Sequence, residues 1–188
     1  MAKTLRFLAP LRLPPRILAK NTIFATEKHQ RMKIEFSVVG KTNESYLREG
    51  AAIFEKRLKH YNPFEVIYIP DVKNGGKLSA EQLKEKEGEA ILGRLQTDDL
   101  LVLLDEQGKM YTSEEFAEQL EKLFQSGGRR IVFQVGGAFG FSKAVYERAN
   151  RKIALSPMTF SHQMVRVFFL EQLYRGFSIL RNEKYHNR

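Results

Sequence analysis

Apolar residues follow two rhythms along the chain, one with a period of two and one with a helical period. Ile34, Phe36 and Val38 alternate with polar neighbours, which predicts a β-strand. Apolar residues then recur at intervals of three and four over residues 43–59, which is typical of a helix. The same rhythms predict strands at 64–69, 100–104, 130–135 and 153–155, and helices at about 79–95, 112–125, 142–150 and 162–180.

Strands and helices therefore alternate regularly, an order typical of a parallel sheet with helices on both faces. Residues 100–104 are a continuous apolar run and 130–135 is nearly one, as expected of strands buried on both faces. Thr112 and Glu115 form the capping-box pattern that opens a helix. We therefore expect an α/β fold, and a length of 188 residues fits a single domain.

Ligands of such sheets bind at the loops that follow the carboxyl ends of the strands. Three loops qualify: Asp105–Lys109, where we expect the chain to turn, Gly136–Phe141 and Ser156–Ser161. The three glycines of the second loop permit positive φ angles and close approach of a ligand to the backbone, although they also fit a plain tight turn. The loop lacks both the G-x-G-x-x-G spacing of dinucleotide-binding proteins and the Lys-Ser/Thr pair of phosphate-binding loops.

The third loop and the final helix are unusually apolar. Met158 and Phe160 fit either core positions or the wall of a pocket for a flat ring. The final helix has more apolar surface than one face of a sheet requires, which suggests a subunit interface, with Phe168, Phe169 and Phe177 spread around its circumference. The polar and aromatic tail, 184–188, is either a frayed end or a flap over a substrate.

Composition narrows the chemistry. Without cysteine the chain has neither disulfides nor thiolate metal sites, and its four histidines are too scattered to suggest a metal centre. No apolar run is long enough to span a membrane. Residues 1–31 hold seven Lys and Arg against Glu27 alone, so six of the nine net positive charges lie there and three in the rest of the chain. The mildly basic body needs a local patch to bind nucleic acid.

Residues 1–31 have no core pattern, and Met32 reads like a natural start. We predict that they form a leader outside the fold, arising from an upstream start codon or from cloning. An Arg-rich organellar transit peptide and an RNA-binding arm are the alternatives.

Residues 32–188 resemble the RlmH family, which comprises ribosomal large-subunit pseudouridine N3-methyltransferases of the SPOUT class. The resemblance covers the whole body in order and at nearly constant spacing. It rests on Met32-Lys-Ile, Val39-Gly-Lys41, Ile69-Pro70, Lys86-Glu-Gly-Glu89, Gly108-Lys109, Val135-Gly-Gly137 with Gly140, Met158-Thr-Phe160 before His162, Glu171-Gln-Leu-Tyr-Arg175 and Tyr185-His186. Many relatives have proline before the histidine, where this chain has Ser161.

The resemblance implies a carboxyl-terminal deep trefoil knot, S-adenosylmethionine as cofactor, and ribosomal RNA of the large subunit or of the assembled ribosome as substrate. It also implies a homodimer in the cytoplasm. Carried over by position, the cofactor contacts fall on Leu104, Gly136, Gly137, Ser156, Pro157, Met158, Thr159, Phe160 and Ser161.

Methylation at N3 of a pseudouridine requires in-line positioning and removal of the N3 proton. His162 or His186 is the candidate base, and the sequence leaves the choice between them open. Arg166 or Arg175 is a candidate for holding a phosphate or stabilising the base anion, and Tyr185 for stacking on the target base.

Three alternatives remain at this point. The first is an RNA-binding module without catalysis, and the second is a SPOUT enzyme with another RNA target. The third, a nucleotide-dependent enzyme on a flavodoxin-like sheet, needs a phosphate loop that the sequence lacks.

Overall fold

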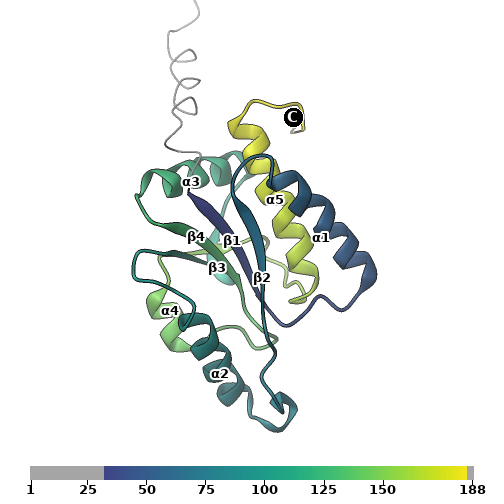
Figure 1. Cartoon of the computed structure of the whole chain (residues 1–188), viewed down its shortest axis with the longest axis vertical. Helices are drawn as coiled ribbons and strands as arrows, with labels where there is room; N and C mark the ends of the chain where they lie inside the picture. Colours follow the sequence, from purple (N-terminus) through teal and green to yellow (C-terminus); the bar gives the residue numbers. More distant parts are fainter. Residues whose placement is uncertain (1–31, 186–188) are drawn as a thin grey trace, which may run out of the picture.

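The computed structural model describes residues 32–185, so the predicted leader and His186 lie outside the described part of the chain. Strands and helices alternate as the sequence predicts (Figure 1). The elements are β1 (Lys33–Val39), α1 (Ser45–Leu58), β2 (Phe64–Ile69), a 3-10 turn (Gly75–Lys77), α2 (Ala80–Leu92), β3 (Leu100–Met110), α3 (Ser113–Gln125), β4 (Arg130–Val135), α4 (Lys143–Arg148), β5 (Arg151–Ala154) and α5 (Met164–Leu180).

The five strands form one sheet in the order β2-β1-β4-β3-β5, and every neighbouring pair is parallel. This confirms the predicted α/β class with a parallel sheet. The chain crosses from β2 at one edge to β3 on the far side of β1 and β4, so the strand order reverses beside β1. Loops that follow β1, β3 and β4 therefore meet at the carboxyl edge, where such folds bind ligands. The deep trefoil knot stays a prediction.

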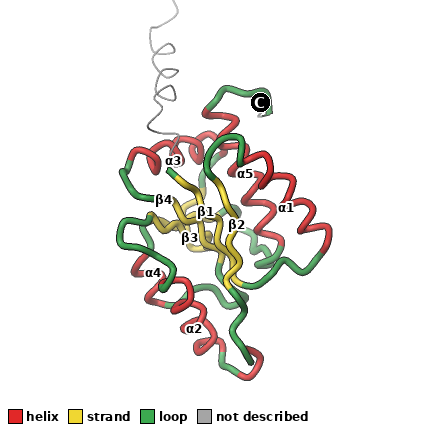
Figure 2. The backbone as a smooth tube through the Cα atoms, in the orientation of Figure 1, coloured by secondary structure: helices red, strands yellow, loops and turns green. Residues whose placement is uncertain are grey.

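Helices cover both faces of the sheet (Figure 2). Buried side chains of α1, α3 and α5 pack on one face, and those of α2 and α4 on the other. Phe169 of α5 lies at the centre of the larger core, with its ring centroid 4.8 Å from that of Phe133 and 5.1 Å from that of Phe36. No helix within residues 32–185 has the length and apolarity needed to cross a membrane.

Two strands differ from their sequence patterns. In β1 the polar residues Glu35 and Ser37 are as buried as their apolar neighbours, because β1 lies inside the sheet and both faces carry helices. The predicted turn at Asp105–Lys109 is wrong in its detail. Strand β3 continues to Met110 through an irregularity, and its pairing with β5 shifts between Leu104 and Lys109.

The helix starts follow their capping residues. The predicted capping box is confirmed at α3, where Thr112 and Glu115 each accept a hydrogen bond from the other's backbone amide. Ser79 and Gln82 form a second box at α2, which the sequence analysis did not identify. Helix α5 begins at Met164 rather than at His162, because the Ser161 hydroxyl accepts a hydrogen bond from the Met164 amide.

A charged cluster holds the amino ends of the strands together. Arg130 of β4 pairs with Glu35 of β1 and, at 2.8 Å, with Asp99, which lies just before β3. Glu35 and Asp99 are each 1% exposed. Burial alone would raise the pKa of Asp99, but hydrogen bonds from Arg130 and from the Gln96 amide, with the charges of Arg130 and Arg129, outweigh burial and lower it.

Asp99→Asn is expected to lower the free energy of unfolding by about 3 kcal/mol at pH 7, because it removes one of the two buried carboxylates that pair with Arg130. Since the pKa of Asp99 is lowered in the folded state, its stabilisation is present above the ordinary carboxyl pKa and disappears as the pH falls through the folded pKa. The free energies of unfolding of the unsubstituted protein and of Asp99→Asn should therefore become equal at acidic pH. Urea denaturation as a function of pH measures this, with the exposed Asp98→Asn as control. Equal stability at pH 7 would contradict it.

Candidate functional site

A pocket of about 670 Å³ opens at the carboxyl edge of the sheet. The three loops expected to bind a ligand line it together, so residues far apart in the sequence meet there. Of the nine predicted cofactor contacts, all but Pro157 belong to its lining: Leu104, Gly136, Gly137, Ser156, Met158, Thr159, Phe160 and Ser161. Of the four predicted catalytic residues, the lining includes His162.

The irregular part of β3, between Leu104 and Lys109, forms one wall of the pocket. Ile153 of β5 is paired with Leu104 and again with Lys109, so residues 105–108 are displaced from the strand ladder. Glycine is required at 108, because a Cβ there would lie 2.5 Å from backbone atoms of Ile153. Residues 105–107 consequently line the pocket.

Two hydrogen bonds tie this wall to its neighbours. The Tyr146 hydroxyl of α4 donates to the Asp105 carboxylate at 2.6 Å. The Thr159 hydroxyl donates to the Glu106 carboxylate at 3.3 Å and so connects β3 to the third loop. Burial, followed by the hydrogen bond to Asp105, raises the pKa of Tyr146, so its hydroxyl keeps its proton and serves as the donor.

The second loop, Gly136–Phe141, is called the glycine loop below, and its glycines are required for different reasons. Gly140 has a φ of +82°, in the region that favours glycine. Gly137 has no positive φ; it is glycine because its Cα packs against the carboxyl group of Glu87, and a Cβ would collide with both carboxyl oxygens. The expectation that this loop includes a positive φ is thus confirmed at Gly140, while the constraint at Gly137 comes from packing.

The third loop is held by its own serines and by an aromatic pair. The Ser156 hydroxyl accepts from the Met158 amide at 2.9 Å. The ring of Phe160 lies 4.8 Å from that of Phe168 on α5, so this ring joins the loop to the helix. Met158 is 75% exposed at the rim. The alternative that Met158 is a core residue is therefore wrong.

Arg166 lies inside the protein rather than in the pocket. It is 1% exposed, and its guanidinium donates to the carbonyls of Val39, Gly40 and His162 and to the hydroxyl of Thr42, at 2.6–3.1 Å. Gln163 adds two hydrogen bonds, one to the Lys41 carbonyl and one from the Asn43 amide. The start of α5 is therefore fastened to the segment that follows β1.

His162 lines the pocket, and its backbone carbonyl accepts a hydrogen bond from Arg166. Burial lowers the pKa of His162, the positive charge of Arg166 lowers it further, and Asp71 opposes the shift. The imidazole is therefore neutral at neutral pH, which is the form that accepts a proton. No group of three or more Asp, Glu or His that could hold a metal ion occurs within residues 32–185.

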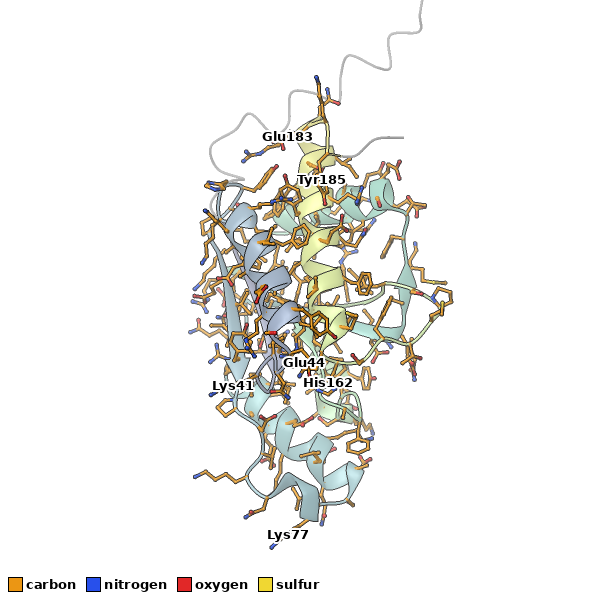
Figure 3. The ribbon with its side chains drawn as sticks, turned by 90° about the vertical axis from the view of Figure 1, so that its right-hand side faces the viewer. Lys41, Glu44, Lys77, His162, Glu183 and Tyr185 are labelled. Carbon is orange, nitrogen blue, oxygen red and sulfur yellow. The ribbon has the colours of Figure 1, made fainter. Side chains whose placement is uncertain are left out.

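Tyr185 lies at the opposite end of α5 from His162 (Figure 3). Its hydroxyl donates to Glu171 at 3.1 Å, its ring packs edge-on against Tyr174, and the Arg175 guanidinium lies over it. These contacts lie seven to eleven residues beyond Met164, the first residue of α5, which is about 10 to 17 Å along the helix axis. The structure therefore does not bring Tyr185 and His162 together within one chain. His186 lies beyond the described residues.

The sequence analysis missed several residues of the site. Tyr146 lies on a helix too short to show a clear period, and Asp105 and Glu106 were predicted as part of a plain turn. Glu87 is buried behind the glycine loop, although a glutamate in a predicted surface helix gives no sign of burial. The one available signal was Gly137, since a Cβ there would collide with the Glu87 carboxyl group.

Comparison with known proteins gives a consistent result. The family described as predicted SPOUT methyltransferase matches residues 32–186. Proteins named ribosomal RNA large subunit methyltransferase H are similar over nearly their whole lengths. Those of Cytophaga hutchinsonii and Parabacteroides distasonis are 54% identical over 156 residues, covering 83% of this chain and 100% and 99% of theirs. The protein of that name from Phocaeicola vulgatus is 47% identical over 156 residues, which cover 83% of this chain and 99% of the relative.

Replacing Arg166 by lysine should lower the free energy of unfolding by about 2–3 kcal/mol, because one ammonium cannot satisfy four separated buried acceptors. Arg175→Lys on the same helix is the control, since its pair with Glu171 is partly exposed and contributes less. Chemical denaturation measures both. If Arg166→Lys kept full stability and lost RNA affinity alone, the earlier prediction of a phosphate contact would stand.

Proposed function

Because the chain belongs to the SPOUT methyltransferase family, we propose that it methylates ribosomal RNA of the large subunit, at N3 of a pseudouridine, in the cytoplasm where ribosomes assemble. The observation that carries this is 54% identity to a ribosomal RNA large subunit methyltransferase over that protein's entire length. We take residues 32–188 as the methyltransferase unit, and 1–31 as a leader that the activity does not need.

The pocket fits S-adenosylmethionine. Its volume suits a ligand of that size, and it combines apolar side chains, including Leu104 and Phe160, with backbone groups of the glycine loop and of residues 156–161. The apolar side chains would enclose the adenine ring, and the backbone amides and carbonyls would bind its polar edge. When bound, the cofactor supplies a methyl group on a positively charged sulfur.

The protein then has to position the base and remove a proton. N3 of a pseudouridine becomes a good nucleophile once its proton has left. His162 is our first candidate for the base, because it lines the pocket and its lowered pKa keeps the imidazole neutral. Methyl transfer should be independent of pH above the lowered pKa of His162 and decline as the pH falls through it. His186 remains the second candidate base.

Arg166 takes a different role from the one predicted. Its buried hydrogen bonds support a positioning function, in which it fixes the backbone carbonyl of His162 and thereby the imidazole at the pocket. Contact with the RNA phosphate would then come from exposed cations instead.

A homodimer would bring tail and pocket together. Phe169 and Phe177 are buried within the chain, so they give no reason for a partner, but Phe168 is 45% exposed and Met164 36%. With Met158 they form an apolar rim beside the pocket, suited to a second copy. Within its own chain Tyr185 packs on Glu171, Tyr174 and Arg175, none of which lines the pocket. We therefore propose that the tail of one subunit completes the pocket of the other, where Tyr185 stacks on the target base.

The function is tested by incubating the full chain with S-adenosylmethionine carrying a labelled methyl group and ribosomes from a strain that lacks this modification. We expect label in large-subunit RNA and, after digestion, in one N3-methylated pseudouridine. RNA binding that is unaffected by the cofactor, without transfer of label, would support the non-catalytic alternative. Label in transfer RNA would point to another SPOUT enzyme.

Removal of residues 185–188 should leave cofactor binding unchanged and reduce methyl transfer at least a hundredfold, the size expected for loss of a general base or its positioning. A mixed dimer tests the arrangement between subunits. One subunit lacks the tail and the other carries a pocket blocked by Gly136→Trp, and the mixture should recover activity that neither parent has. Full activity of the truncated chain would make the tail a frayed end.

A further inference from the structure

Glu87 is a buried carboxyl group without a counter-charge. It lies on α2 and is 7% exposed, and its Oε2 has no hydrogen-bond partner among the described residues. Placing an acidic group in such a position is costly unless something compensates for it. A residue with only a structural role would be expected to have a partner.

The surroundings leave room for this carboxyl group. Gly137 packs against it, and a Cβ at Gly137 would come within 2.6 Å of Oε1. The neighbouring Gly88 faces the Ser142 hydroxyl, a second buried polar group with no partner in the described chain. Two glycines are thus required where α2 meets the segment after β4, and the carboxyl group that Gly137 accommodates is not used by the proposed base chemistry.

The glycine loop separates Glu87 from the pocket. Gly137 lines the pocket and also packs against the Glu87 carboxyl group. Burial, followed by the negative charge of Asp71, raises the pKa of Glu87. The other charged or titratable groups that line the pocket are Lys84 of α2, which is paired with Glu81, His162, Tyr146, and the carboxylates Asp105 and Glu106, which accept hydrogen bonds from Tyr146 and Thr159. A cation bound in the pocket would favour the ionised carboxylate.

We propose that Glu87 recognises the positive charge of the methyl donor from behind the glycine loop, and so makes the pocket favour S-adenosylmethionine over S-adenosylhomocysteine. The two ligands differ by a methyl group and by the charge of the sulfonium. A negative charge behind Gly137 stabilises the charged donor and gives no such stabilisation to the neutral thioether product. The inference rests on the proposed cofactor and extends it to selectivity between donor and product, which would help the product to leave.

Calorimetric titration of Glu87→Gln with each ligand tests this. The substitution keeps size and removes charge, and since Oε2 has no hydrogen-bond partner among the described residues, the thermal midpoint should not fall. We expect donor affinity to drop roughly tenfold, as for a screened charge pair several ångströms apart, with product affinity unchanged. Glu89→Gln, exposed on the same helix, is the matched control and should change neither affinity.

An equal loss for both ligands, or an unchanged ratio of their affinities, would overturn the proposal. If Glu87→Gln does not fold, the ratio is measured against pH in a His162→Gln background, which removes the titrating imidazole of the lining. Because burial raises the pKa of Glu87, preference for the donor should then increase with pH above the range in which ordinary carboxyl groups ionise. A flat ratio would refute the role of Glu87. Failure of the unsubstituted protein to bind either ligand would instead refute the proposed cofactor.

Discussion

The hydrogen bonds of Arg166 hold the site in its shape. This one guanidinium joins the first turn of α5 to the segment after β1 and to the His162 carbonyl. Those segments lie more than 120 residues apart in the sequence. Because the acceptors are buried carbonyls and a hydroxyl, losing the guanidinium would leave several polar groups unsatisfied in the interior. The position of His162 at the end of the third loop therefore depends on this contact.

The general fold could be read from the sequence because its signals are local. Apolar runs at 100–104 and 130–135 predicted buried strands, and Thr112 with Glu115 predicted the start of α3. The three loops then met at one edge because parallel strands place their carboxyl ends together. Most of the lining followed from this topology and from the family resemblance, including the whole third loop except Pro157.

The parts that could not be predicted depend on contacts between distant residues. The irregularity after Leu104 comes from the way β5 pairs twice with β3, and the burial of Glu87 comes from a glycine that lies fifty residues further on. Arg166 resembled an RNA-binding arginine because a helical arginine near a loop gives no sign of buried carbonyls around it. Tyr185 was assigned to the site by resemblance, but within one chain it packs on α5 away from His162, a placement that depends on the fold of the tail and not on any local sequence signal.

The central claim is that the three loops at the carboxyl edge form one cofactor pocket. Titration of isotope-labelled protein with S-adenosylmethionine, followed by amide NMR, tests it most directly. We expect the perturbed amides to cluster in residues 104–107, 136–141 and 156–162, which line the pocket on three sides. Perturbation confined to another surface, or none at saturating cofactor, would contradict the account.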